Sequence, residues 1–368
     1  MTLIYSGLVW HGEVWSHSHE LAIHLSENKK IIYHEVPPVN DPNHPSIRKT
    51  KDGKFPKNIK VIQSVNEFDK FNLTYLLFTQ IFMIRGIFHV RKKFKTIMIY
   101  NVYDWPVLIL SKLLKKKIIF MYVDEYCELT PNFILKTYLK FNTWLFLKLS
   151  NHVVCTAHLL KSHADKYNKN VDYLPNCVNL EDENNLTKKT EEDFIIGFVG
   201  GLGSWVDIEM IMQTAKHFEE DETIKFWVIG SGERYNEFDE LIRRHHVMNI
   251  ELFGNIPHNK MYSHLSQFDI GIIPFKINKI TNSVSPIKLF EYWLAKKPVI
   301  TTKTYELESM PNIIYVNTYH DMIEEIKELY NRRDNIKKIG EAGYKLVKEK
   351  YNWENTMKRY EGILQNGI

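Results

Sequence analysis

Short hydrophobic segments alternate with amphipathic segments along the whole chain, and this alternation predicts the fold class. In the first half, apolar runs typical of buried strands lie at Leu3–Gly7, Lys30–Pro37, 58–65, Lys95–Asn101, 118–126, 151–157 and 170–176. Leu21, Ala22 and Leu25, which follow the first run, fall on one face of a helix. Apolar strands that alternate with helices indicate an α/β fold with a parallel sheet buried on both faces.

A polar stretch interrupts this pattern at Asn176–Asp193, and we interpret it as a linker. Strand-like runs then resume at 194–203, 224–233, 250–257, Asp269–Phe275, 297–302 and 313–317, and the chain ends in amphipathic helices. We therefore predict two Rossmann-like parallel-sheet domains, at 1–180 and 190–345, facing across a cleft. Ligands of such sheets bind outside the carboxyl ends of the strands, so we expect the site in strand-to-helix loops.

Cysteine usage and the first residues bear on the compartment. The 368 residues include three cysteines, Cys127, Cys155 and Cys177, an odd number without C-x-x-C spacing. This argues against a disulfide framework or a zinc site and favours a reducing, cytoplasmic environment. The first residues lack the pattern of a secretory signal, and no run is long enough to span a membrane. Leu73–Val90 comes nearest to such a length, and we interpret it either as a buried helix or as a helix that lies in a membrane interface.

Positive charge is concentrated in the first half of the chain. Met1–Leu180 has 24 Lys and Arg against 14 Asp and Glu, whereas the remainder has 24 against 30. A basic half suggests an anionic partner, either an acidic lipid head group or an acidic substrate. No recognition motif accompanies the charge, so we do not expect nucleic acid. The basic runs Arg91–Lys95 and Lys112–Lys117 are either solvated faces or peripheral contacts with the cytoplasmic face of an anionic membrane.

The segment "NSVSPIKLFEYWLAKKPVI" (Asn282–Ile300) follows a predicted strand and carries two charges in an otherwise apolar helix. Ser285 can cap this helix and Pro286 suits its first position. A helix start offers free N–H groups and the positive dipole end, which together bind anions. Lys288 adds charge for a phosphate, and Glu291, one turn on, can accept two hydrogen bonds from a ribose diol. The alternative is a surface i,i+3 ion pair, worth at most about 0.5 kcal/mol.

Three segments resemble a known enzyme family. "SPIKLFEYWLAKKPVI" is similar to the donor-site signature of GT-B glycosyltransferases of the family 4 type. "GFVGGLGSWVDIEMI", "IPFKINKITNSVSPIKLFEY" and "MYVDEY" resemble glycosyltransferases of cell-surface polysaccharide assembly, such as the teichuronic-acid type. The resemblance covers nearly the whole chain and is strongest over Gly197–Thr302. It implies the GT-B fold, with the last helix, 346–368, crossing back to the N-terminal domain.

The resemblance also implies roles for single residues. Glu291 would hold the donor ribose, the backbone amides of Ile287 and Lys288 the diphosphate, and the backbone of Ile256 the nucleobase. The family usually carries a further Glu eight residues before the second, where this chain has Ser283. That departure puts the sugar contacts and the stereochemical outcome in doubt.

The turn "GGLGSWVD" stands where relatives carry a basic pair. Its glycines, Gly201 and Gly203 among them, would let the backbone approach a phosphate; a plain turn is the alternative. No Asp-x-Asp follows an apolar strand, so we expect no metal and no other cofactor. Lys288 and helix N-termini would replace a metal electrostatically.

Two segments of the first half offer candidates for a general base and for acceptor binding. Asp124 follows an apolar strand, and similar inverting enzymes place an Asp base in this domain; a helix cap or a role for Glu125 are the alternatives. Gly12, His17 and His19 follow the first strand, with His19 a second catalytic candidate and Gly12 and His17 candidate acceptor contacts. The i,i+2 spacing of the two histidines disfavours a metal site.

Together these observations predict a glycosyltransferase that moves a sugar from a nucleotide diphosphate sugar, expected to be a UDP-sugar, to a surface polysaccharide or its lipid-linked precursor. The alternatives are a non-catalytic nucleotide-sugar-binding subunit of an assembly complex, a GT-B epimerase, and a dinucleotide-dependent dehydrogenase. The last lacks G-x-G-x-x-G after its first strand.

Overall fold

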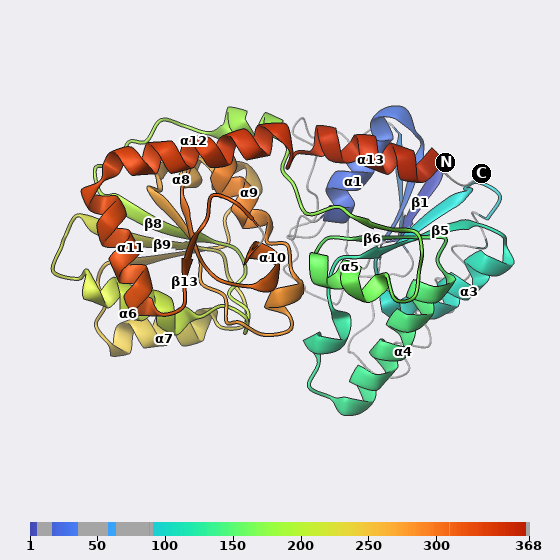
Figure 1. Ribbon diagram of the computed structural model, residues 1–368, viewed down its shortest axis with the longest axis horizontal. Helices are drawn as coiled ribbons and strands as arrows, with labels where there is room; N and C mark the ends of the chain where they lie inside the picture. The colour runs from blue at the N-terminus through green and yellow to red at the C-terminus, as the bar shows by residue number, and fades with distance from the viewer. Residues whose placement is uncertain (6–16, 36–57, 64–87, 89–90, 309, 366–368) are drawn as a thin grey trace. The chain divides into compact units, whose positions relative to one another are not determined.

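The chain folds into two compact units, each built on one parallel sheet. The computed structural model describes residues 1–5, 17–35, 58–63, 88, 91–308 and 310–365. Unit 1 comprises Met1–Leu174 together with Met357–Ile368, and unit 2 comprises Pro175–Thr356. Figure 1 shows both units with their helices labelled.

Unit 1 contains a seven-stranded sheet. Its strands are β1 (Thr2–Tyr5), β2 (Ile31–Glu35), β3 (Ile59–Gln63), β4 (Thr96–Ile99), β5 (Lys117–Tyr122), β6 (His152–Cys155) and β7 (Val171–Tyr173). They are all parallel, in the order β3-β2-β1-β4-β5-β6-β7. The central strands are apolar at almost every position because helices cover both faces of the sheet.

In the described part of unit 1 the helices are α1 (His17–Asn28), α3 (Trp105–Leu113), α4 (Phe133–Leu149) and α5 (His158–Ala164), with 3-10 turns at Val102–Asp104 and Tyr126–Leu129. Figure 1 shows α1 on one side of the sheet and α3, α4 and α5 on the other. The last helix, α13 (Trp353–Gln365), begins in unit 2 and continues in unit 1 from Met357. There Lys117 Nζ donates to Ile363 O at 2.7 Å.

Unit 2 contains a six-stranded sheet. Its strands are β8 (Phe194–Val199), β9 (Ile224–Ile229), β10 (Ile250–Gly254), β11 (Ile270–Ile273), β12 (Val299–Thr302) and β13 (Ile314–Val316). They are also parallel, in the order β10-β9-β8-β11-β12-β13. The strand order reverses between β8 and β11, and a doubly wound sheet binds its ligand at such a point.

Helices cover both faces of this second sheet. They are α6 (Ile208–His217), α7 (Tyr235–Arg244), α8 (His258–Gln267), α9 (Ile287–Leu294), α10 (Tyr305–Glu308), α11 (Tyr319–Asn331) and α12 (Arg333–Glu349), with 3-10 turns at Leu180–Asn185 and Thr281–Ser283. In Figure 1, α6, α7 and α11 lie on one side of the sheet and α8, α9 and α12 on the other.

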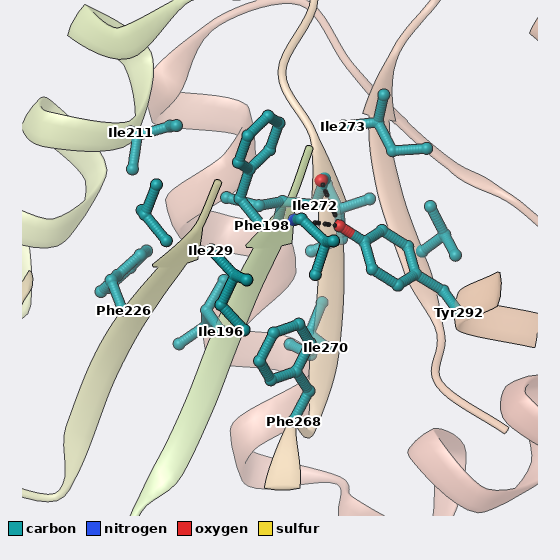
Figure 2. Close-up of a cluster of buried hydrophobic side chains, with 14 of the residues drawn as sticks. Ile196, Phe198, Ile211, Phe226, Ile229, Phe268, Ile270, Ile272, Ile273 and Tyr292 are labelled. Carbon is teal, nitrogen blue, oxygen red and sulfur yellow. Dashed lines mark hydrogen bonds between the residues drawn. The ribbon is translucent and has the colours of Figure 1, made fainter. Parts of the chain in front are cut away.

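Tyr292 of α9 connects the helix layer to the centre of the second sheet. Its hydroxyl accepts a hydrogen bond from Val199 N at 2.9 Å and donates to Ile272 O at 3.4 Å. Figure 2 shows this ring among the side chains of the buried cluster, which include Phe198 and Phe268. These two hydrogen bonds fix the position of α9 relative to β8 and β11, and thereby the position of the residues at the start of α9.

The structure bears on the predicted linker and on the candidate membrane segments. The polar stretch Asn176–Asp193 is not a free linker, because it forms a 3-10 turn and belongs to unit 2. Its backbone there bonds to side chains of α8, as in Thr190 N to Gln267 Oε1 at 2.7 Å. Leu73–Val90 lies outside the described residues except for Phe88. No helix in the described part of the chain is long and apolar enough to cross a membrane.

Candidate functional site

The loops that follow β8, β9 and β11 come together at the carboxyl edge of the unit 2 sheet. Gly200 N donates to Ile229 O at 2.8 Å, and Leu202 N donates to Ser231 O at 2.9 Å. On the other side, Lys276 N donates to Trp205 O at 2.9 Å. These backbone bonds fix a glycine-containing turn against the loop that leads into α9.

Gly200 gives Lys288 room to enter this turn. The backbone of Gly200 has φ +129°, a conformation that residues with a side chain rarely adopt. A Cβ at this position would lie 2.7 Å from Lys288 Nζ. Gly201 is exposed, and a Cβ on it would lie 3.7 Å from Ser231 O. Gly203 packs against Trp205, whose ring would lie 2.4 Å from an added Cβ. Gly201 is therefore open to a ligand, whereas Gly203 accommodates an internal ring.

Lys288 and Glu291 are both buried, and neither side chain forms a hydrogen bond or ion pair among the described residues. Their side chains lie one turn apart in α9 with relative exposures of 8% and 6%. Both side chains are thus almost fully removed from solvent. The Nζ of Lys288 instead lies 4.0 Å from the ring centroid of Phe198 and 5.2 Å from that of Phe275. Two buried ionisable groups without hydrogen bonds are costly unless a ligand supplies the bonds.

Burial displaces the pKa of both groups toward neutrality. It lowers the pKa of Lys288 to about 7, and the charge of Glu291 only partly opposes this. It raises the pKa of Glu291 to about 7, where Lys288 opposes the shift and Asp182 adds to it. Lys288 is thus poised to gain its charge when an anion arrives.

The start of α9 differs in one detail from the prediction. Pro286, not Ser285, is the N-cap, and no side chain caps the helix. Ser285 does not cap because its hydroxyl accepts from Asn176 N at 3.3 Å. The backbone N–H groups of Ile287 and Lys288 have no hydrogen-bond partner among the described residues. The helix therefore presents two free donors beside a buried lysine.

The remaining donor-side candidates lie around this helix start or farther along the same edge. Ser283, which stands where relatives carry Glu, is buried, and its hydroxyl donates to Lys279 O at 2.7 Å. Ile256 follows β10 and is half-buried against the core. Ile287 is exposed.

The sequence did not single out Phe198 and Phe275, the rings that flank Lys288. Phe198 lies in an apolar strand and Phe275 just after one, so their only sequence signal was a strand-like run. Asp182, whose charge acts on Glu291, was assigned to the linker.

In unit 1, the acidic pair lies just beyond the end of β5. Burial raises the pKa of Asp124 to about 6. Glu125 is held in place, because the Tyr122 hydroxyl donates to it at 2.8 Å and the Cys127 thiol donates to it at 3.2 Å. His163 Nδ1 lies 3.0 Å from the Tyr122 hydroxyl. Asp124 can thus exchange a proton near neutral pH, whereas Glu125 is engaged by two hydrogen bonds.

The two histidines occupy different surroundings. His17 Nδ1 lies 3.0 Å from the Tyr100 hydroxyl and Nε2 lies 3.2 Å from the Tyr360 hydroxyl, so both ring nitrogens have partners. Burial lowers the pKa of His17 to about 4. His19 is fully buried and stacks on Tyr33 with ring centroids 5.4 Å apart. Gly12 lies outside the described residues.

No group of three or more His, Cys, Asp or Glu side chains among the described residues could hold a metal ion.

Comparisons with known proteins bear on the family and the fold. Residues 209–362 match a family model described as glycosyl transferase-like. The putative teichuronic acid biosynthesis glycosyltransferase TuaH of Bacillus subtilis is 24% identical over 168 residues, or 42% of this chain and 41% of TuaH. The phosphatidylinositol N-acetylglucosaminyltransferase GPI3 subunit of Saccharomyces cerevisiae is 24% identical over 213 residues, or 53% of this chain and 45% of that protein. The matches thus span less than half of these curated relatives.

Solved structures match over the full chain. Sucrose-phosphate synthase from Thermosynechococcus elongatus has a TM-score of 0.78 at 13% identity and covers 99% of this chain and 98% of its own. Anabaena HepE in complex with UDP-glucose has a TM-score of 0.73 at 12% identity, and the match covers 100% of this chain and 99% of HepE. The two parallel-sheet units and these neighbours show the GT-B fold, and the match of residues 209–362 to a glycosyl transferase-like model agrees with the resemblance inferred from the sequence.

Proposed function

We propose that the protein is a glycosyltransferase that uses a nucleotide diphosphate sugar, with a UDP-sugar as the first candidate. The observation that carries the proposal is the buried pair Lys288 and Glu291, which forms no hydrogen bond or ion pair among the described residues, next to two backbone N–H groups that also lack a partner there. The amides of Ile287 and Lys288 would bind the diphosphate, the Lys288 ammonium would offset its charge, and Glu291 would accept the ribose hydroxyls. HepE, a structural neighbour, is described in complexes with UDP and UDP-glucose.

The transfer itself requires three coupled changes. The acceptor hydroxyl oxygen forms a bond to the anomeric carbon, and the bond from that carbon to the diphosphate oxygen breaks. The electron pair leaves with the diphosphate, where Lys288 and the helix N–H groups stabilise the added charge without a metal. The hydroxyl proton passes to Asp124, whose raised pKa of about 6 suits a base that works near neutral pH.

For the acceptor, we propose a surface polysaccharide or a lipid-linked glycan precursor. The support is the match to TuaH, which is named as a putative teichuronic acid biosynthesis glycosyltransferase, and to GPI3, which is named as a subunit of a phosphatidylinositol N-acetylglucosaminyltransferase. The net positive charge of Met1–Leu180 also suits an anionic acceptor or lipid.

A thermal-shift panel tests the donor site. Wild type and Glu291→Ala are measured with UDP, GDP, ADP and CMP, each with and without magnesium. We expect one diphosphate to raise Tm without magnesium, and Glu291→Ala to lose that shift. Glu324→Ala is the matched control, because Glu324 pairs with Lys327 at the same i,i+3 spacing on the exposed face of α11. No shift with any nucleotide in wild type would overturn the proposal.

Product formation separates an enzyme from a non-catalytic binding subunit. With the nucleotide identified, sugar transfer or slow donor hydrolysis is followed for wild type and Asp124→Ala. We expect turnover in wild type and nucleotide binding without turnover in the variant. Binding without turnover in both proteins, across the sugars and acceptors tested, would favour the binding subunit.

A further inference from the structure

Helix α4 of unit 1 has an outward face that is apolar, aromatic and basic. Phe133, Ile134 and Phe141 have relative exposures of 80%, 79% and 58%. The buried residues of the same helix, Leu139, Asn142, Thr143, Phe146 and Leu147, lie on the opposite side. At 100° per residue, Phe133, Thr137, Phe141, Trp144 and Lys148 fall on one stripe. A soluble helix normally turns polar residues outward, so this stripe requires an explanation.

The charge on α4 has one sign. The helix contains Lys136, Lys140 and Lys148 and no Asp or Glu. Lys136 is paired with Glu128 at 2.6 Å, which leaves Lys140 and Lys148 as its outward cations. The Lys148 ammonium lies 5.2 Å from the ring centroid of Trp144, and the Phe141 and Trp144 rings lie 5.6 Å apart. Aromatic rings between lysines are the composition of a helix in a membrane interface.

The segment that contains α3, which precedes α4 in the chain, extends the positive charge. The stretch Trp105–Lys117, which includes α3, contains four lysines and no acidic residue. Several of these lysines bond to the fold: Lys112 Nζ donates to Leu149 O at 2.8 Å, and Lys116 Nζ donates to Phe94 O at 2.7 Å. They therefore add a positive field next to α4 rather than a flexible contact of their own.

We propose that the outward face of α4, defined by Phe133, Ile134, Phe141, Trp144, Lys140 and Lys148, docks on an anionic lipid bilayer. The apolar side chains would enter the interface and the two lysines would contact the head groups. A neutral apolar partner would not account for the absence of acidic residues from the helix. The inference rests on α4 and the lysines beside it, and it does not depend on the glycosyltransferase proposal.

Vesicle co-sedimentation of the full chain tests the docking surface. Vesicles of phosphatidylglycerol and phosphatidylcholine are compared with vesicles of phosphatidylcholine alone. We expect binding to the anionic vesicles that weakens with salt, and at least a tenfold loss in the triple variant Phe133→Ser, Ile134→Ser, Phe141→Ser. Lys140→Gln with Lys148→Gln should lose about fivefold for each charge and show a smaller salt dependence.

The control variant removes exposed apolar side chains from unit 2 instead of from α4. Met248 and Ile277 of unit 2 are also exposed, so Met248→Ser with Ile277→Ser should leave vesicle binding unchanged. Because the substituted side chains are exposed, the variants should keep their Tm, which is checked in parallel.

A second measurement locates the contact. Lipids brominated in their acyl chains should quench the fluorescence of wild type more than that of Trp144→Phe, because only the former has an indole on the docking face. Equal vesicle binding by wild type and the triple variant would overturn the proposal, as would no binding by wild type at low salt. A dimer in solution that the triple variant dissociates, with no vesicle binding, would assign the face to a second copy instead.

Discussion

Gly200 and Lys288 lie in contact, although they are 88 positions apart in the sequence, and a Cβ on Gly200 would lie 2.7 Å from Lys288 Nζ. Gly200→Ala should therefore displace the Lys288 ammonium and also strain the backbone, which has φ +129° there. We expect a loss of about 1–3 kcal/mol in the free energy of unfolding and at least tenfold weaker diphosphate binding. Urea unfolding and calorimetric titration with UDP measure the two effects.

Gly362→Ala is the control for that substitution. Gly362 lies inside α13, and an added Cβ would meet nothing within 4 Å. Alanine should raise stability by about 0.5–1 kcal/mol through helix propensity and leave nucleotide binding unchanged. Equal effects of the two substitutions on nucleotide binding would contradict the role assigned to Gly200.

Lys288→Met should stabilise the unliganded protein in a pH-dependent way. The folded-state pKa of Lys288 is lowered to about 7 by burial, so the unfolded chain binds more protons between about pH 7 and 10.5. The cost of burying the ammonium is therefore full below pH 7 and shrinks as pH rises toward 10.5. At pH 6, where Glu291 with its pKa of about 7 is protonated, we expect the variant to gain about 1–4 kcal/mol.

The same variant should bind diphosphate at least tenfold more weakly, because the buried counter-charge is gone. Chemical denaturation at pH 6 and pH 10, with and without nucleotide, measures both effects. Lys327→Met on the exposed face of α11 is the control and should change neither. A gain in stability that stays constant with pH would indicate better packing of methionine rather than relief of a buried charge.

These charges illustrate what spacing alone cannot predict. Glu324 and Lys327 have the same i,i+3 spacing as Lys288 and Glu291, yet the first pair is exposed with its charges 2.9 Å apart. The second pair is buried and forms no ion pair among the described residues, and the Lys288 ammonium lies against the rings of Phe198 and Phe275. The motif resemblance, not the spacing, identified which pair to choose.

The fold was more accessible to sequence reasoning than the site. Apolar runs such as Phe194–Val199 are strands in the structure because helices bury both faces of a parallel sheet. Capping was less predictable: Ser285 and Pro286 suit the first two positions of a helix, but the contact of Ser285 with Asn176 moves the helix start by one residue. Asn176 lies 109 positions away, so local pattern carries no signal for it.

Asp124→Asn tests the assignment of the general base. Wild-type kcat/KM should rise with pH around 6 as Asp124 loses its proton, because burial raises its pKa to about 6. The variant should lose about 100-fold or more in turnover, keep nucleotide affinity within about twofold, and lack that acid limb. Asp165→Asn, on the exposed end of α5, is the control.

The carboxyl of Asp124 should also affect the free energy of unfolding, in a direction that follows from its raised pKa. The folded state holds its proton more tightly than the unfolded chain between about pH 4 and 6, so the contribution of Asp124 to stability falls as pH rises through that range. At pH 8 the Asn variant should be more stable than wild type by about 1–2 kcal/mol. A variant that is less stable at pH 8 would point to a structural hydrogen bond instead of a poised base.

Tyr292→Phe tests how firmly the sheet core positions α9. The hydroxyl accepts from Val199 N at 2.9 Å in a fully buried environment, so its removal leaves a backbone N–H without a partner (Figure 2). We expect a loss of about 1–3 kcal/mol in the free energy of unfolding. Nucleotide affinity should fall as well, by a smaller factor than in Lys288→Met, because Val199 directly precedes Gly200 and Tyr292 directly follows Glu291. Tyr305→Phe, where the ring is half exposed, should change neither quantity. If Tyr292→Phe lowers stability but leaves nucleotide affinity intact, the hydroxyl supports the core without setting the geometry of the donor residues.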